Sequence, residues 1–446
     1  MADEVRGVSL PRLIAFAAGD FAFNLYWQSV MLYLLFYYTD ALGLDITLAA
    51  SLYLVASVWD GVASFAVGVI ADRRGSARRF RLALVLGAVP LGLAFAMAYV
   101  APPFAGMAGI AFVLGGHVLF RTAYALVNVP YLAMSARVSA LSGDRAMVAG
   151  LRMLAGTGAA VAVAMGTVPL GTSLAGAAGP RAYLAAAMVF AVIATIMLIA
   201  VGLSFRDAAP PDARMHPSIA ASLVSLWRNR AFVTLSGAMI AMIVAVTIVG
   251  KSVLYYFKYA VGDEAAGQLA LAAMMAVSAV AVPGWMWAAR AIGARAVWFV
   301  AVAICALLLV GFAAIDVARA GLAQALLVAM QAAIVGLHFA FWALLPDTVE
   351  YGQRTTGLRV EGTVFGVAAL LQRVAIGLAT ALLGWSFDEA GYAANAVQGD
   401  ATLAGMRLSV ALWPLGFLAL SALLMWWNPL RRGEHDRIVR ELAGAA

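Results

Sequence analysis

Twelve long apolar runs, separated by short polar segments, dominate this sequence. Each is near the roughly 20 mostly apolar residues that a helix needs to cross a bilayer. The runs lie near residues 12–39, 46–71, 82–101, 105–134, 146–171, 181–204, 231–261, 266–289, 296–316, 321–345, 362–386 and 405–428. Hydrophobic residues make up 65% of the chain and charged residues 11%, against about half and a quarter in soluble domains. This composition excludes a soluble enzyme, a disordered chain and a nucleic-acid-binding protein.

The basic residues predict how the chain is oriented in the membrane. With a cytoplasmic N-terminus, 21 of the 29 Lys and Arg residues fall in cytoplasmic segments and 4 in outer segments. Cytoplasmic loops are rich in Lys and Arg, so we expect both termini in the cytoplasm. The N-terminal apolar run is too long for a cleavable signal peptide. The net charge of +7 therefore indicates topology, and we expect a multi-pass cell-membrane protein, such as one of the bacterial inner membrane.

The longest polar interruption, 205–230, divides the runs into six and six. We therefore expect an all-α membrane protein built from two six-helix bundles. The expected parts are an N-terminal bundle over 1–205, a cytoplasmic middle loop over 206–230, a C-terminal bundle over 231–428 and a cytoplasmic tail over 429–446. The middle loop contains a candidate short surface helix over 217–226. Two related halves around a central path are typical of secondary transporters.

Several motifs resemble a known transporter family. The loop from Gly68 to Arg79, which contains Asp72, Arg73 and Arg78, resembles a loop signature of the major facilitator superfamily. Other segments resemble its glycoside–pentoside–hexuronide:cation symporters; these are Gly19-Asp20-Phe21, Trp59-Asp60-Gly61, Asn128-Val129-Pro130-Tyr131, and Asp347 to Gly352 followed by Thr356-Gly357-x-Arg359-x-Glu361-Gly362. The resemblance implies the twelve-helix major facilitator fold and secondary active transport of a sugar or glycoside by alternating access, not an enzyme.

Only two acidic residues, Asp20 and Asp60, lie well inside apolar runs. A carboxylate at a helix centre costs about 2.5–3.5 kcal/mol on insertion scales, so such residues are candidates for function. Asp60 is either the coupling-cation or proton site, or part of a structural ion pair with Arg121 or Arg373. Asp20 is either an acceptor for substrate hydroxyls beside Arg152, or part of a purely structural pair with Arg152.

The resemblance implies further site residues. The substrate-binding candidates are Asp20, Trp27, Tyr124, Asn128, Arg152, His338, Gln372 and Arg373, and the candidates for cation or proton coupling are Asp60, Ser64, Asp20 and Arg373. Alternatives remain for several basic residues. Arg373 could form a helix-packing salt bridge, Arg152 and Lys251 could extend toward water, and His117 and His338 could be proton relays or hydrogen-bonded core histidines.

The coupling site departs from the family pattern. The family's sodium site has a second aspartate, an amide and a threonine. At these positions this chain has Ser64, Ala63 and Ala125. Sodium needs several oxygen ligands to replace its hydration shell, whereas a proton needs one carboxylate whose pKa is raised by burial. We therefore expect coupling to protons, or its loss, rather than to sodium.

The sugar site departs as well. The family has a lysine before the aspartate at position 20, an aspartate in the fourth run and a tryptophan four residues later. At these three positions this chain has Gly19, Asn128 and Leu132. We therefore expect a substrate other than melibiose. A same-fold carrier of an amphiphilic or non-sugar substrate, such as a lysolipid, remains an alternative.

Charged loops are candidates for gating. We expect Asp72, Arg73 and Arg78 to form a charge latch on the inner gate, and Asp347 and Glu350 to pair with arginines there.

We expect no cofactor and no metal, since the lone cysteine, Cys305, has no metal-binding neighbours in sequence. The expected partners are a small-molecule substrate, a coupling cation and membrane lipids, for a monomer that binds no nucleic acid. An intramembrane transferase is disfavoured because the runs contain no acidic cluster, and a non-transporting receptor would fail a counterflow assay.

Overall fold

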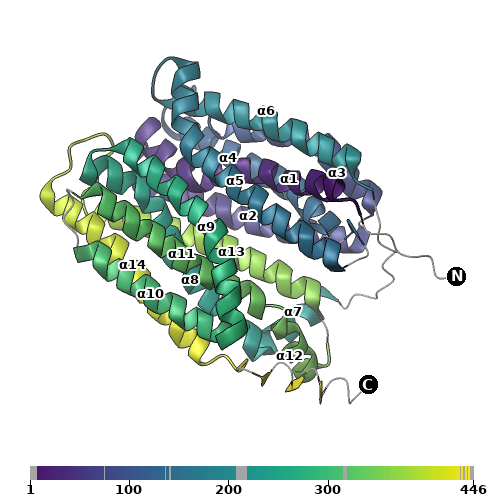
Figure 1. The fold of residues 1–446 in the computed structure, drawn as a ribbon. Helices are drawn as coiled ribbons and strands as arrows, with labels where there is room; N and C mark the ends of the chain where they lie inside the picture. The colour runs from purple at the N-terminus through teal and green to yellow at the C-terminus, as the bar shows by residue number, and fades with distance from the viewer. Residues whose placement is uncertain are drawn as a thin grey trace. The chain divides into compact units, whose positions relative to one another are not determined.

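A computed structural model gives the fold of the protein (Figure 1). It describes residues 8–74, 76–135, 137–139, 142–206, 218–314, 319–358, 360–431, 433–434, 437–438 and 440–441. Throughout these ranges all regular secondary structure is helical, with no strand. The chain forms two compact units.

The first unit comprises Met1–Ala213 together with Ala393–Ala396. Its helices are α1 (Leu10–Ser29), the π-helical turns η1 (Val30–Leu34) and η2 (Tyr37–Ala41), α2 (Ile46–Arg74), α3 (Ala77–Met97), α4 (Gly106–Ser135), α5 (Ser142–Ala175) and α6 (Pro180–Ser204). In this unit α1 packs against α5 and α6, and α4 packs against α2 and α3. These contacts bring together the helices that carry Asp20, Asp60 and their candidate partners.

The second unit comprises Arg214–Tyr392 and Val397–Ala446. Its helices are α7 (Ile219–Arg228), α8 (Arg230–Tyr255), the π-helical turn η3 (Tyr256–Val261), α9 (Glu264–Ile292), α10 (Ala294–Ala314), α11 (Ala320–Leu344), α12 (Asp347–Thr356), α13 (Glu361–Glu389) and α14 (Asp400–Trp426). The short helix expected in the middle segment is present as α7, which packs against α8 and α12.

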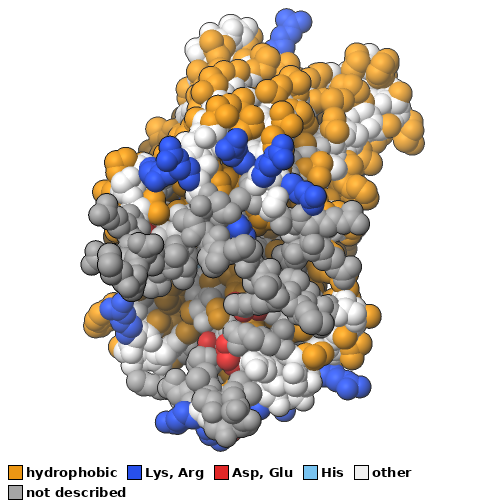
Figure 2. Space-filling view, turned by 90° about the vertical axis from the view of Figure 1, so that its right-hand side faces the viewer, with side chains coloured by type: hydrophobic (Ala, Val, Ile, Leu, Met, Phe, Trp, Pro, Cys, Tyr) orange, Lys and Arg blue, Asp and Glu red, His pale blue; other side chains and the backbone are white. Residues whose placement is uncertain are grey.

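Eleven helical stretches in the described part of the chain are long and apolar enough to cross a membrane. They coincide with the second to the twelfth predicted runs. The first run is α1 with its π-helical continuation to Ala41. Large apolar side chains stand exposed on these helices, among them Leu86, Leu93 and Leu307, and apolar side chains cover much of the face in Figure 2. An exposed apolar surface of this kind fits a lipid environment.

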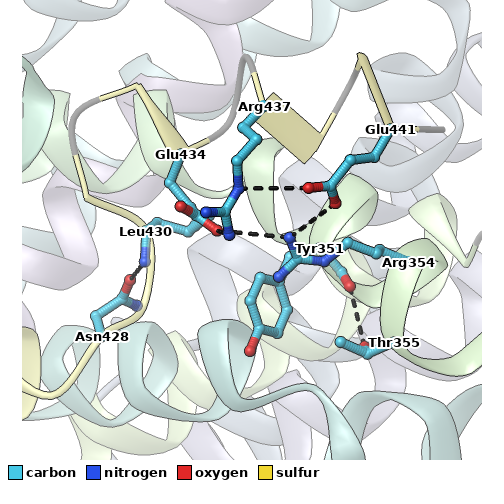
Figure 3. A network of polar contacts seen from close by, with 8 residues as sticks. All are labelled: Tyr351, Arg354, Thr355, Asn428, Leu430, Glu434, Arg437 and Glu441. Atoms are coloured by element: carbon cyan, nitrogen blue, oxygen red, sulfur yellow. Dashed lines mark hydrogen bonds and ion pairs between the residues drawn. The ribbon is translucent and has the colours of Figure 1, made fainter. Parts of the chain in front are cut away.

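The segment after α14 is bound to α12 by a polar network (Figure 3). Arg354 lies 3.5 Å from Glu434 and 3.3 Å from Glu441, and Arg437 lies 2.6 Å from Glu434. The guanidinium of Arg354 also stacks over the Tyr351 ring, with its Cζ 5.2 Å from the ring centroid. Exposed ion pairs contribute little one by one, so it is the combination that holds this segment against α12.

Candidate functional site

Asp20 and Arg152 meet between α1 and α5. Arg152 donates from Nε to Asp20 Oδ2, and its Nη2 lies 3.4 Å from Oδ1. The Tyr131 hydroxyl of α4 donates to Asp20 Oδ2 over 2.8 Å. The side chains of Asp20 and Arg152 are 16% and 20% exposed. The two residues are therefore paired, as expected, yet both remain partly open to a ligand.

Gly19 explains why Tyr131 can reach Asp20. A Cβ atom built on Gly19 would lie 2.6 Å from Cε2 of the Tyr131 ring. A lysine at position 19, as in the family pattern, would therefore compete with Tyr131 for this space. Sequence reasoning missed Tyr131 as a site residue, although the Asn128-Val129-Pro130-Tyr131 motif contained it.

The aromatic candidates lie on the same helices. The Trp27 ring of α1 is 5.9 Å from the Tyr124 ring of α4, and Cζ of Arg121 lies 5.2 Å from the Trp27 centroid. Asn128 lies one turn beyond Tyr124 and is buried, and no hydrogen bond of its amide is found among the described residues. Trp27 thus lies beside both Tyr124 and the arginine that pairs with Asp60.

Asp60 and Arg121 form a fully enclosed ion pair between α2 and α4. Arg121 Nη1 lies 3.1 Å from Asp60 Oδ2, and both side chains are 1% exposed. Arg121 is one of the two arginines considered as partners of Asp60. A guanidinium keeps its charge under all ordinary conditions, so a positive charge stays beside this carboxylate in the folded protein.

The other nitrogens of Arg121 are also bonded. Its Nε donates to His117 Nε2 over 3.1 Å, and its Nη2 donates to the Tyr53 hydroxyl over 3.4 Å. Since Nε2 of His117 accepts, a neutral imidazole carries its proton on Nδ1, which lies 3.2 Å from the Tyr38 hydroxyl. His117 is therefore a hydrogen-bonded core residue in this arrangement. Sequence reasoning missed Tyr38 and Tyr53, because nothing in their spacing distinguishes them from other span tyrosines.

Two oxygen ligands of the family's sodium site are absent beside Asp60. Ser64 Oγ donates to Asp60 Oδ1 over 3.4 Å, while Ala63 and Ala125 contribute no side-chain oxygen. No group of three or more His, Cys, Asp or Glu residues that could hold a metal ion occurs in the described ranges. Asp60 thus has a guanidinium and a hydroxyl beside it.

The candidates of the second unit lie on three helices. Gln372 and Arg373 are half-buried near the middle of α13, and Lys251 is buried in α8. His338 of α11 has Nδ1 3.1 Å from the Ile334 carbonyl oxygen of its own helix. The roles assigned to these residues stay predictions.

The gating candidates are placed only in part. Arg78 is exposed in the first turn of α3, whereas the side chains of Asp72 and Arg73 lie outside the described residues. Asp347 and Glu350 are half-buried in the first turn of α12, where acidic residues favour the positive end of the helix dipole. Their pairing with arginines stays a prediction.

Comparison with known proteins decides the family. The profile of the family described as "MFS/sugar transport protein" matches residues 15–432. This chain belongs to that family. Its resemblance to the glycoside–pentoside–hexuronide:cation symporters is thereby confirmed. The protein is a multi-pass membrane transporter and not an enzyme.

Curated relatives align along nearly the whole chain. A putative sulfoquinovose importer of Salmonella typhimurium is 27% identical, covering 98% of this chain and 93% of the relative. A glucuronide carrier protein homolog of Escherichia coli is 26% identical over 96% of this chain and 94% of its own length. A putative glycoside/cation symporter of E. coli is 23% identical over the same shares.

Solved structures share the fold. A bacterial homolog of the lysosomal transporter Spinster has a TM-score of 0.69 at 12% identity, covering 95% of this chain and 98% of that chain. A D-xylose-proton symporter has a TM-score of 0.64 at 16% identity, covering 93% and 96%. The expected major facilitator fold is therefore confirmed.

Proposed function

We propose that this protein is a symporter of a sugar or glycoside with a proton, and that it works by alternating access. The carrying observation is that two carboxylates inside the spans of the first unit are each paired with an arginine, one partly open and one enclosed. The relatives, which include a glycoside/cation symporter, a sulfoquinovose importer and a glucuronide carrier homolog, support the same substrate class.

The Asp20–Arg152 pair is proposed to bind the sugar. A carboxylate accepts hydrogen bonds from hydroxyls and a guanidinium donates them, and bonds that involve a charge are about twice as strong as neutral ones. The pair has no net charge, so it suits a neutral polyol. The Asn128 amide can both donate and accept, and Trp27 and Tyr124 offer aromatic surface beside it.

The Asp60–Arg121 pair is proposed as the coupling site. Sodium would have to approach a carboxylate already occupied by a guanidinium and with Ser64 as its nearby hydroxyl. A proton needs no cage, and its transfer to Asp60 would release Arg121 toward His117 and Tyr53, which already accept from it. Nε and Nη2 of Arg121 would thereby keep their acceptors, while Nη1 would give up the carboxylate.

The test begins with a ligand screen. Thermal shift of the purified protein identifies a ligand among glycosides, pentoses, hexuronates and lysolipids, and its uptake is then measured in proteoliposomes. We expect a sugar or glycoside to be taken up faster with an acidic exterior, without stimulation by sodium. A response to lysolipids alone would establish the amphiphilic alternative instead.

Variants separate the two sites. Asp60→Asn keeps an oxygen acceptor for Arg121, so we expect it to retain counterflow and to lose the response to the pH gradient. Asp20→Asn should lose both ligand-induced stabilisation and counterflow. Asp400→Asn, at an exposed residue in the first turn of α14, is the control. Sodium-stimulated uptake that disappears in Asp60→Asn would contradict proton coupling, and unchanged ligand responses in both variants would reject the two assignments.

A further inference from the structure

One face of α1 is partly open in the second half of the helix, where the other side chains are buried. Between Gly19 and Val30 the partly exposed side chains are those of Asp20, Phe21, Asn24, Trp27 and Gln28. Their spacing of three and four residues places them on a single helix face. The helix packs against α5 and α6 of the same unit, and its open face borders α5, where Arg152 pairs with Asp20.

This open face is polar. Asp20, Asn24 and Gln28 follow one another at intervals of four residues, so they form a stripe about 12 Å long at 1.5 Å per residue. Polar groups facing hydrocarbon are costly because lipid offers no hydrogen bonds. A stripe of a carboxylate and two amides is therefore better explained by contact with an aqueous path than by contact with lipid.

The two amides are ordered but not saturated. Asn24 Nδ2 donates to the Asp20 carbonyl oxygen over 2.9 Å, and Gln28 Nε2 donates to Asn24 Oδ1 over 3.3 Å. A primary amide has two N–H donors and two acceptor sites. Among the described residues nothing bonds to Gln28 Oε1, and each amide has a second N–H to offer. The amides therefore hold each other in place and keep capacity for a ligand.

The neighbouring helix is shaped to leave room for this stripe. A Cβ atom at Gly156 of α5 would lie 3.0 Å from Asn24 Nδ2. Arg152, which binds Asp20, lies one turn before Gly156 on the same helix. Asp20 with Arg152 and Asn24 with Gly156 are thus successive layers between α1 and α5. The stripe continues the Asp20 site directly.

We propose that Asn24 and Gln28, with Trp27 beside them, form a second sugar subsite, and that the substrate has two hydroxylated units, as in a disaccharide. One unit is held at Asp20 and Arg152, as under the proposed function on which this inference rests. The second unit lies along Asn24 and Gln28, which exchange hydrogen bonds with its hydroxyls, while Trp27 offers an aromatic ring to its apolar face. A stripe about 12 Å long exceeds what a single pyranose ring can span.

The test compares one-unit and two-unit ligands on the intact protein in lipid nanodiscs. Isothermal titration is made with melibiose, lactose, cellobiose, maltose and xylobiose, and with galactose, glucose and xylose. We expect at least one disaccharide to bind more tightly than its constituent monosaccharides. In Gln28→Leu the disaccharide should bind about tenfold more weakly, the loss expected for one to two hydrogen bonds, while monosaccharide affinity stays within about twofold.

Two further variants keep the test decisive. Asn24→Ala removes the other amide without adding volume beside Gly156, and it should act in the same direction if Gln28→Leu proves unstable. Gln324→Leu is the matched control, because Gln324 Nε2 donates to the Ala266 carbonyl oxygen of the second unit over 2.9 Å; it should leave the ratio of the two affinities unchanged.

The outcomes separate the two proposals. Binding of monosaccharides alone, or an equal effect of Gln28→Leu on both ligand sizes, overturns the second subsite and leaves the proposed sugar transport intact. Absence of binding by every saccharide rejects the proposed function itself.

Discussion

At the scale of single residues, Asp60 and Arg121 differ in how each can respond to losing its partner. A buried carboxylate can take up a proton and become neutral, whereas a guanidinium cannot lose one. Removal of one member of a buried pair typically costs about 3–5 kcal/mol. We therefore expect Asp60→Leu to destabilise the protein by about this amount, and Arg121→Met to cost less.

The double variant checks this explanation. Asp60→Leu with Arg121→Met leaves no unpaired charge, and apolar replacement of a buried pair is often neutral. Its midpoint of thermal unfolding in detergent should exceed that of Asp60→Leu alone. A double variant less stable than both single variants would mean that Arg121 matters mainly through His117 and Tyr53.

Gly19 gives a second prediction at this scale. In Gly19→Ala the new methyl group meets the Tyr131 ring at 2.6 Å, and overpacking of this kind costs about 1–3 kcal/mol. We expect a lower unfolding temperature and weaker ligand binding, because Tyr131 would be displaced from Asp20. Gly115→Ala in α4 is the control, since its Cβ would meet nothing within 4 Å and alanine favours a helix by up to about 1 kcal/mol. Equal stability of the two variants would show that Tyr131 moves freely.

The sequence identified the buried charges but not all of their partners. Asp20 and Arg152 were expected to pair, whereas Asp60 had two candidate arginines. Which arginine reaches Asp60 depends on the rotation of each helix about its axis, and hydropathy does not fix that rotation. Tyr131 was missed for the same kind of reason, since its contact with Asp20 depends on the absence of a side chain at Gly19.

At the scale of elements, the apolar runs predicted the helices well because lipid obliges each segment to satisfy its own backbone hydrogen bonds. The π-helical turns η1 and η2 were not predicted. There the hydroxyls of Tyr33 and Tyr37 donate to the carbonyl oxygens of Ala164 and Tyr99. Such register shifts accompany contacts made across the bundle, so local sequence gives no signal for them.

Helix α7 exposes large apolar side chains, unlike a helix on the surface of a soluble protein. Ser222 and Ser225 are buried, and Ser225 lies 2.7 Å from the Thr356 hydroxyl, at the end of α12. Leu223, Val224 and Trp227 are exposed, Trp227 by 82%. Apolar exposed faces with a tryptophan are typical of helices that lie in the membrane interface. We therefore expect α7 to rest on the bilayer.

Tryptophan fluorescence tests this expectation. The emission of Trp227 is the difference between the emission of the unchanged protein and that of Trp227→Phe. In nanodiscs with lipids brominated near the headgroup, this emission should be quenched. Lipids brominated near the chain ends should quench it less. The same difference measured for Trp298, which is fully buried, should respond to neither lipid. Emission from Trp227 that ignores bromine but responds to aqueous iodide would place α7 in water.

At the scale of the whole molecule, charge distribution is what predicts sidedness. Figure 2 shows a face on which Lys and Arg side chains are spread and Asp and Glu side chains are few among those described. With a cytoplasmic N-terminus, 21 of the 29 Lys and Arg residues fall in the segments expected on the cytoplasmic side. Both observations accord with the positive-inside rule, and the resulting orientation is open to a direct test.

The single cysteine makes that test simple, because Cys305 is buried in α10 and Cys305→Ser leaves a cysteine-free chain. Two exposed positions then serve as reporters: Val397, 102% exposed between α13 and α14, and Arg431 in the segment after α14. With both termini cytoplasmic, Val397→Cys should react with a membrane-impermeant maleimide in intact cells. Arg431→Cys should react only after the membrane is permeabilised, since its segment is expected on the cytoplasmic side. The reverse pattern would invert the topology, and labelling of both in intact cells would mean that the C-terminal segment is not shielded by the membrane.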